Sequence, residues 1–306
     1  MTGAHRADMH GKACLITGAS SGLGLQTAVG LAHAGADLIL VCRDPQRGKQ
    51  ARKCIARQAP RANIDLQLAD FERLESIRTL SEKVLNDHPV IHVLINNAGT
   101  FQKALRRTAD GFEATWQVNH LAPFLLTNLL LGRLITSAPA RVVTVASAMH
   151  RDARIDFDSL DAHQGYSMLN AYSRSKLATI LFTFELARRL EGRGVTSNCL
   201  HPGMVATGIG DTGGVAGLAW RLMKPFMLTP AEGAETALYL ASSPAVAGIT
   251  GTYFVEKRAA QPDPIALDRA LQARLWDVSA RMTGLVETQD RGARGAEEAR
   301  IGPLRP

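Results

Sequence analysis

Two side chains that can carry out proton transfer, Tyr172 and Lys176, lie four residues apart in the stretch NAYSRSKLATILFTFELARRL. Residues four apart lie on the same face of a helix. A nearby ammonium group favours the ionised phenol, so this spacing predicts a lowered pKa for Tyr172. A phenol that loses its proton near neutral pH can act as a general acid or base. Alone the spacing is a weak signal, because any helix can carry it by chance, and a tyrosine beside a solvated lysine is the ordinary alternative.

A glycine-rich turn, TGASSGLG at residues 17–24, ends the apolar run ACLITG and opens a helix-like stretch. Glycines at such a place allow a tight turn and let backbone N–H groups approach a diphosphate at the helix N-terminus. The spacing is G-x-x-x-G-x-G, and no Lys-Ser/Thr pair follows it, which argues against the phosphate loop of an NTPase. The turn therefore predicts a dinucleotide site, with a glycine turn that binds nothing as the alternative.

The end of the second apolar run bears on the choice of dinucleotide. An NAD site favours an acidic residue there, to bind the ribose hydroxyls. This chain has Cys42-Arg43-Asp44, in which Arg43 can pair with a 2′-phosphate. We therefore predict NADP(H) in preference to NAD(H). Asp44 could be a ribose ligand or only a turn starter before Pro45.

Short apolar runs alternate with helix-like stretches along most of the chain, beginning with ACLITG, DLILVCRD and ANIDLQLAD. Apolar strands without alternation are typical of a parallel sheet that helices cover on both faces. We therefore predict an α/β fold with a doubly wound parallel sheet of about seven strands, a Rossmann fold in a single domain at residues 11–290. Residues 1–10 and 291–306 are expected to be flexible. Thr229, Pro230 and Glu232 predict a helix start with a capping box.

Composition excludes several classes of function. The net charge is +7 over 306 residues, but the basic residues are scattered without interleaved aromatics, so we expect no nucleic-acid partner. The four cysteines show no CxxC spacing and no metal-ligand spacing appears, which predicts a reaction without metal. The N-terminus MTGAHRADMHGK has no apolar core, and VNHLAPFLLTNLLLGRLI contains polar residues. We therefore expect a cytoplasmic protein without stable membrane insertion. The apolar helices around Phe124 and Phe182 could pair in a homodimer or homotetramer, or could be internal.

Four motifs in order, TGASSGLG, NNAG at residues 96–99, YSRSK at 172–176 and HPG at 201–203, resemble the short-chain dehydrogenase/reductase family. The resemblance covers roughly residues 11 to 257. The stretches VCRD, VNHLAPFLLTNLL and YSRSKLATILFTFELARRL are similar to its retinol-dehydrogenase-like branch. That branch implies an NADP(H)-dependent enzyme that reduces or oxidises lipophilic carbonyls and alcohols.

The resemblance also implies contacts to the cofactor. Arg43 would hold the adenosine phosphate, and Asp70 would bond the adenine amino group, although Asp70 could simply cap the next helix. The remaining contacts are a diphosphate turn of Gly18, Ser20, Ser21, Gly22, Leu23 and Gly24, an adenosine side of Asn97, Ala98 and Gly99, and a nicotinamide-amide site of Pro202, Gly203, Val205 and Thr207. Thr207 could instead be a turn residue.

For catalysis the resemblance implies that Tyr172 gives or takes the proton and that Lys176 also bonds the nicotinamide ribose. Ser147 would hold the substrate oxygen, because Ala146 before it has no hydroxyl. Asn119 would position a water behind the lysine. The ordinary alternatives are a strand-end serine and a buried, satisfied amide. His120, His150 and His201 are interpreted as core or loop histidines.

The substrate wall is expected on either side of this set. Residues 204–228 are glycine-rich and apolar, which suits a lid over a lipophilic substrate. Met149 and Met204 are candidate substrate contacts, because methionines adapt to irregular shapes. Core or interface positions are the alternative for both.

The predicted function is transfer of a hydride between NADP(H) and the carbonyl or alcohol carbon of a lipophilic substrate, with Tyr172 as proton donor or acceptor. One alternative is a reductase of a conjugated C=C bond in the same family. Another is a dinucleotide-binding regulator without catalysis.

Overall fold

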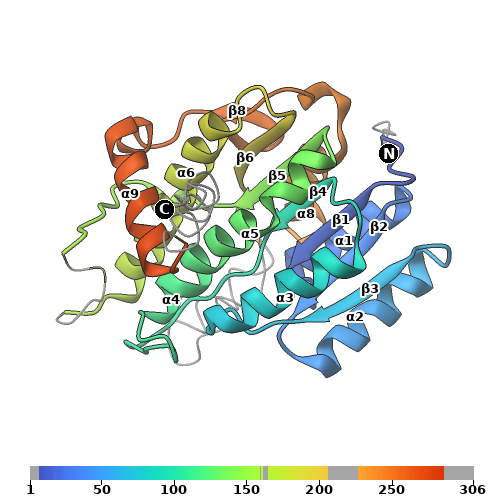
Figure 1. Cartoon of the computed structure of the whole chain (residues 1–306), viewed down its shortest axis with the longest axis horizontal. Coiled ribbons are helices and arrows are strands. Elements are labelled where there is room, and N and C mark those ends of the chain that lie inside the picture. The colour runs from blue at the N-terminus through green and yellow to red at the C-terminus, as the bar shows by residue number, and fades with distance from the viewer. Residues whose placement is uncertain (1–6, 159, 161–164, 206–226, 286–306) are drawn as a thin grey trace, which may run out of the picture.

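One eight-stranded sheet with helices on both faces forms the protein, seen in a computed structural model that describes residues 7–158, 160, 165–205 and 227–285 (Figure 1). The strand order is β3-β2-β1-β4-β5-β6-β7-β8, and all neighbours are parallel except β7 and β8. The strands are β1 (Ala13–Thr17), β2 (Asp37–Cys42), β3 (Ile64–Leu68), β4 (Val93–Asn96), β5 (Ala140–Val145), β6 (Val195–His201), β7 (Thr252–Val255) and β8 (Arg258–Ala260). The predicted Rossmann-type fold is confirmed.

The extra strand β8 is missing from the sequence prediction for a physical reason. It has three residues and follows a turn in which Glu256 and Lys257 both adopt positive φ angles, 49° and 64°. Its exposed segment RAA carries no apolar alternation, so nothing in the pattern marks it as a strand.

Two groups of helices cover the two faces of the sheet. Residues of α1, α2 and α8 pack on one face, and residues of α3, α5 and α6 pack on the other, with α9 lying against α6. The helices are α1 (Gly22–His33), α2 (Pro45–Gln58), α3 (Leu74–Asp87), α4 (Ala114–Trp116), α5 (Ala122–Thr136), α6 (Met168–Arg189), α8 (Pro230–Ser242) and α9 (Arg269–Met282). The predicted capping box of Thr229 and Glu232, with Pro230 in the first turn, is confirmed at the start of α8.

The strand order reverses beside β1, which pairs with β2 on one side and β4 on the other. In a doubly wound sheet, connections leave such a pair of strands in opposite directions, so a crevice opens at their carboxyl ends. The glycine turn follows β1 and the NNAG motif ends β4, which places both at this crevice.

The helical run through α4, a π-helical turn and α5 has the length and composition of a membrane span at Ala114–Thr136. Its most apolar window is 67% buried inside the protein. Phe124 is fully buried, and its ring packs on Phe182 and on Trp276 of α9. The apolar faces around Phe124 and Phe182 are therefore internal to the chain, the second of the two alternatives.

Part of the N-terminal segment 1–10, which the sequence predicts to be flexible, packs on the rest of the fold. Met9 is buried in the core beside α1, its N–H donates to the carbonyl of Ala34, and its own carbonyl accepts from Lys12. The ordered chain thus extends before residue 11. The expected tail at 291–306 lies outside the described residues, as does the expected lid except for 204, 205, 227 and 228.

Phe124→Ala should lower the free energy of unfolding by about 3–5 kcal/mol, because it removes a fully buried ring and leaves a cavity between α5, α6 and α9. Urea denaturation measures the change. Leu267→Ala is the control, since Leu267 is 50% exposed and its truncation should cost under about 1 kcal/mol. Equal losses in the two variants would contradict this account of the core.

Candidate active site

The glycine turn after β1 is shaped by close backbone approach. Gly18 has a φ of +66°, and a Cβ at this position would lie 2.9 Å from the Cα of Ala98. Helix α1 begins at Gly22, and its N-cap residue Ser21 makes no capping hydrogen bond through its side chain. The first turn also contains no acidic residue. The first N–H groups of α1 therefore keep their capacity to bind an anion, as a diphosphate turn requires.

The segment after β4 is fastened to this turn. The hydroxyl of Thr17 accepts from the N–H groups of Asn97 and Ala98, both at 3.0 Å. The Asn97 amide donates to the carbonyl oxygens of Thr17 at 2.8 Å and Gly18 at 3.2 Å. The predicted adenosine-side residues thus lie directly against the predicted diphosphate turn.

Two arginines stand at the carboxyl end of β2. Arg43 is 70% exposed and forms an ion pair with Glu72. Arg47, one turn into α2, donates to the Ser21 hydroxyl at 3.0 Å and so reaches the glycine turn. Asp44 caps α2 by accepting from the N–H of Arg47 at 2.8 Å, which is the turn-starter alternative. Sequence reasoning missed Arg47, although its position one helical turn after Arg43 was a usable signal.

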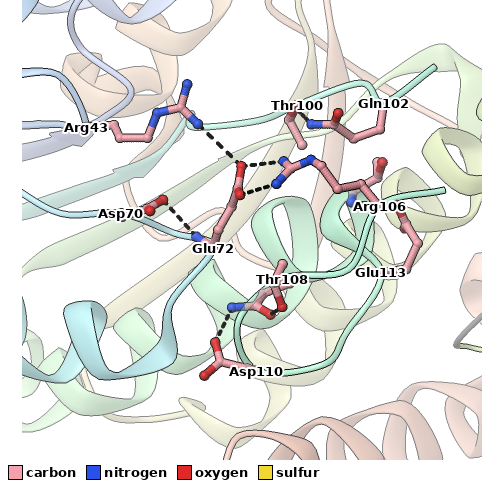
Figure 2. Close-up of polar contacts among 11 residues, drawn as sticks. Arg43, Asp70, Glu72, Thr100, Gln102, Arg106, Thr108, Asp110 and Glu113 are labelled. Atoms are coloured by element: carbon pink, nitrogen blue, oxygen red, sulfur yellow. Dashed lines mark hydrogen bonds and ion pairs between the residues drawn. The ribbon is translucent and has the colours of Figure 1, made fainter. Parts of the chain in front are cut away.

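Asp70 closes a turn before α3. Its carboxylate accepts from the N–H of Glu72 at 3.1 Å (Figure 2). Its own N–H donates to the hydroxyl of Ser76 at 2.9 Å. The N-cap residue of α3 is Arg73, so Asp70 does not cap the helix itself. Its role toward adenine stays a prediction.

The phenol of Tyr172, in the second turn of α6, lies close enough to the hydroxyl of Ser147 to interact with it. Phe101 packs edge-on against the tyrosine ring, with 4.8 Å between centroids. Burial raises the pKa of Tyr172, and the interaction with Ser147 acts in the opposite direction. The predicted lowering of this pKa by Lys176 is wrong, because removal of the phenol from water dominates.

Lys176 is buried under the tyrosine, with its Nζ atom 5.5 Å from the centroid of the Tyr172 ring. The ammonium donates to the carbonyl oxygen of Val145 at 2.8 Å. Burial lowers the pKa of Lys176 to about 8. A Cβ on Gly99 would lie 3.9 Å from this Nζ and 3.4 Å from the Oδ1 of Asn119, so the two predicted catalytic residues meet the β4 loop here.

Asn119 lies in the π-helical turn Gln117–Leu121, a feature often found at functional sites. Its amide nitrogen donates to the Thr100 carbonyl and to the Ser175 hydroxyl, both at 3.0 Å, and its Oδ1 accepts from the N–H of Thr100 at 2.7 Å. Both amide donors are thus used within the protein. The role of Asn119 in positioning a water stays a prediction.

The backbone of Ser147 is hydrogen-bonded to His150, a residue that the sequence analysis did not single out as functional. Ser147 caps a short helical turn, Ala148–His150, by accepting from the N–H of Met149 at 3.2 Å. The Nε2 of His150 accepts from the N–H of Asp263 at 3.0 Å, so its Nδ1 donates to the Ser147 carbonyl at 2.7 Å. Burial lowers the pKa of His150, which keeps the ring neutral for this pair of bonds.

The other histidines fit the core and loop interpretation. His120 is buried with its Nε2 2.7 Å from the hydroxyl of Ser279, and burial lowers its pKa to about 3. His201 ends β6, and burial lowers its pKa as well. Among the residues with described positions, no group of three His, Cys, Asp or Glu side chains could hold a metal ion.

The loop after β6 returns to the glycine turn. Val205 is buried, and a Cβ on Gly233 of α8 would lie 2.5 Å from Val205 and 3.2 Å from Leu23. Gly203 has a φ of +84°, a conformation that favours glycine. Met204 is 57% exposed and Met149, across the sheet edge, is 39% exposed. Thr207 lies outside the described residues.

Lys176→Met should change the pH dependence of stability. Between pH 8 and 10.5 the unfolded chain binds a proton at this lysine that the folded protein has lost, so the free energy of unfolding of the wild type rises with pH. The variant lacks this term. Its stability relative to the wild type should be greater near pH 7 than near pH 10, by up to roughly 3 kcal/mol.

Urea denaturation at the two pH values measures this difference. Lys83→Met, a change of an exposed lysine on α3, is the control and should show no such pH dependence. If the difference in free energy of unfolding between Lys176→Met and wild type were constant with pH, burial would not lower the pKa of Lys176, and this account of the buried ammonium would be wrong.

Known proteins resemble this chain over the region that contains these residues. The profile of the short chain dehydrogenase family matches residues 12–213. Human retinol dehydrogenase 14 is 45% identical over 296 residues, covering 91% of this chain and 88% of its own, and human retinol dehydrogenase 12 is 41% identical over 275 residues, covering 90% and 87%. A crystal structure of an uncharacterised protein from Mycobacterium paratuberculosis superimposes with a TM-score of 0.76 at 32% identity, covering 93% of this chain and 97% of the other. The chain belongs to the short-chain dehydrogenase/reductase family and resembles its retinol dehydrogenases, enzymes that act on alcohols and carbonyls.

Proposed function

We propose that this enzyme transfers a hydride between NADP(H) and the carbonyl or alcohol carbon of a lipophilic substrate, with Tyr172 as proton donor and acceptor. The observation that carries the proposal is the placement of the Tyr172 ring over the buried ammonium of Lys176, with the Ser147 hydroxyl beside its phenol. These groups lie next to the β4 loop, which is itself fastened to the glycine turn.

The residues present fit a phosphorylated dinucleotide. The close approach of the Ala98 backbone to Gly18 leaves no room for a Cβ and keeps the turn tight, and the first turn of α1 offers N–H groups without an acidic residue. Arg43 and Arg47 supply two cations at the end of β2, and the two carboxylates beside them are both engaged: Asp44 accepts from the N–H of Arg47, and Glu72 is paired with Arg106 as well as with Arg43. This charge pattern supports a 2′-phosphate and hence NADP(H) rather than NAD(H). Bound NADP(H) would supply or accept the hydride.

The chain's own residues would handle the oxygen and the proton. Ser147 would bind the substrate oxygen, where a donor stabilises developing charge. The raised pKa of Tyr172 keeps the phenol protonated near neutral pH, which suits donation of a proton during reduction. Lys176 would stabilise the phenolate that remains, and Asn119 would position the water through which a proton returns.

The substrate class rests on relatives and on exposed apolar side chains. The relatives at 41–45% identity are named retinol dehydrogenases. Met149 lies two residues after Ser147, and Met204 lies directly after Gly203. Both methionine side chains are exposed. We therefore propose a long apolar aldehyde or alcohol of the retinoid kind as substrate.

Tyr172→Phe should reduce turnover with retinal and NADPH by about 10²–10⁴-fold, because the phenol's proton is removed and the ring is kept. Binding of NADPH, measured by fluorescence titration, should change little. Tyr239→Phe on α8, a tyrosine that packs with the other face of the sheet, is the matched control and should retain wild-type turnover. Full activity in Tyr172→Phe would exclude Tyr172 as the proton donor.

A further inference from the structure

Glu72 joins two segments that are far apart in the sequence. Arg106, in the loop between β4 and α4, donates to both carboxylate oxygens of Glu72, with 2.6 Å between its Nη2 and Oε1 (Figure 2). Arg43 contacts the same Oε1 at the longer distance of 3.3 Å. Arg106 therefore binds the Glu72 carboxylate in a bidentate manner, and Arg43 forms a single, longer contact with it.

The three side chains differ in exposure in a way that distinguishes their roles. Glu72 is 16% exposed, Arg106 is 44% exposed and Arg43 is 70% exposed. The hydrogen bonds from Arg106, more than the charge of Arg43, lower the pKa of Glu72. Glu72 is therefore a carboxylate at neutral pH, and Arg43 is the partner that can most readily turn to another anion.

A fixed negative charge at this place conflicts with the proposed ligand. Arg43 is the residue that would hold the 2′-phosphate, and Glu72 lies within ion-pair distance of it. An unneutralised Glu72 would repel the phosphate and would also draw Arg43 away from it. The bidentate contact from Arg106 cancels this charge.

We propose that Arg106 determines selectivity for NADP(H) without touching the cofactor, by neutralising Glu72 so that Arg43 stays available to the 2′-phosphate. The proposal rests on the proposed function and adds a positioning residue to it. Arg106 acts through Glu72, and its effect therefore exists only while Glu72 carries its charge.

Loss of Arg106 need not disturb the loop, because other bonds anchor it. The Asp110 carboxylate accepts from the N–H of Leu74 at 2.8 Å and from the Gln117 amide at 2.6 Å. The backbone carbonyl of Arg106 accepts from the N–H of Ala114 at 2.9 Å, a contact that a substitution keeps.

The test is a double-mutant cycle with Arg106→Gln, Glu72→Gln and the double variant, in which dissociation constants for NADPH and NADH are measured by fluorescence titration. Arg106→Gln should weaken NADPH binding about tenfold, or roughly 1.4 kcal/mol, and leave NADH binding nearly unchanged. In the Glu72→Gln background the same substitution should change NADPH binding less than about twofold. The tenfold loss should also shrink at high salt.

Arg107→Gln is the matched control, since it removes the same charge from the neighbouring residue, whose guanidinium donates to the carbonyl of Gly111 instead. It should affect NADPH binding less than about twofold. A tenfold effect of Arg106→Gln that persists in the Glu72→Gln background would mean that Arg106 acts on the phosphate directly, and would overturn the proposal. An unchanged ratio of NADPH to NADH affinity in Arg106→Gln would overturn it as well. If the wild type itself showed no preference for NADPH, the proposed cofactor assignment would fail first.

Discussion

The buried ammonium of Lys176 is the constraint on which the rest of the site depends. A charged group removed from water is costly unless it finds partners, and here its described hydrogen bond is to the carbonyl of Val145 at the end of β5. That bond ties α6 to the carboxyl edge of the sheet. The same cation lies beneath the Tyr172 ring and beside Gly99 and Asn119, so one charge organises the residues proposed to move the proton.

A continuous set of contacts links this charge to the cofactor half. Gly99 adjoins Lys176, and the residues just before it, Asn97 and Ala98, are bonded to Thr17 at the start of the glycine turn. Thr100, just after it, is bonded to Asn119. A single short segment after β4 therefore touches the glycine turn on one side and the proposed catalytic residues on the other, which explains how their relative positions are fixed.

The sequence allowed the sheet to be predicted because it depends on local pattern, and the glycine turn and the proposed catalytic residues were identified from motifs. Residues that act through contacts between distant segments were not found this way. Arg106 meets Glu72 across 34 positions, and His150 meets Asp263 across 113, so neither pairing leaves a local signal.

The predicted direction of the pKa shift of Tyr172 was also wrong. Helical spacing shows that Lys176 is near, but it does not show how deeply the phenol is buried. The strand β8 escaped notice because its three residues carry no apolar pattern. In each case the missing information is burial or a long-range partner, which only the folded chain supplies.

The most direct test of the account is to follow the hydride itself. Wild-type enzyme is incubated with retinal and with NADPH that carries deuterium at both C4 positions, and the product is analysed by mass spectrometry and NMR. We expect retinol with one deuterium on the carbinol carbon. Deuterium on a chain carbon with the aldehyde retained would show a C=C reductase instead. Bound NADPH without any transfer to this or other carbonyls would contradict the catalytic roles and favour a dinucleotide-binding regulator.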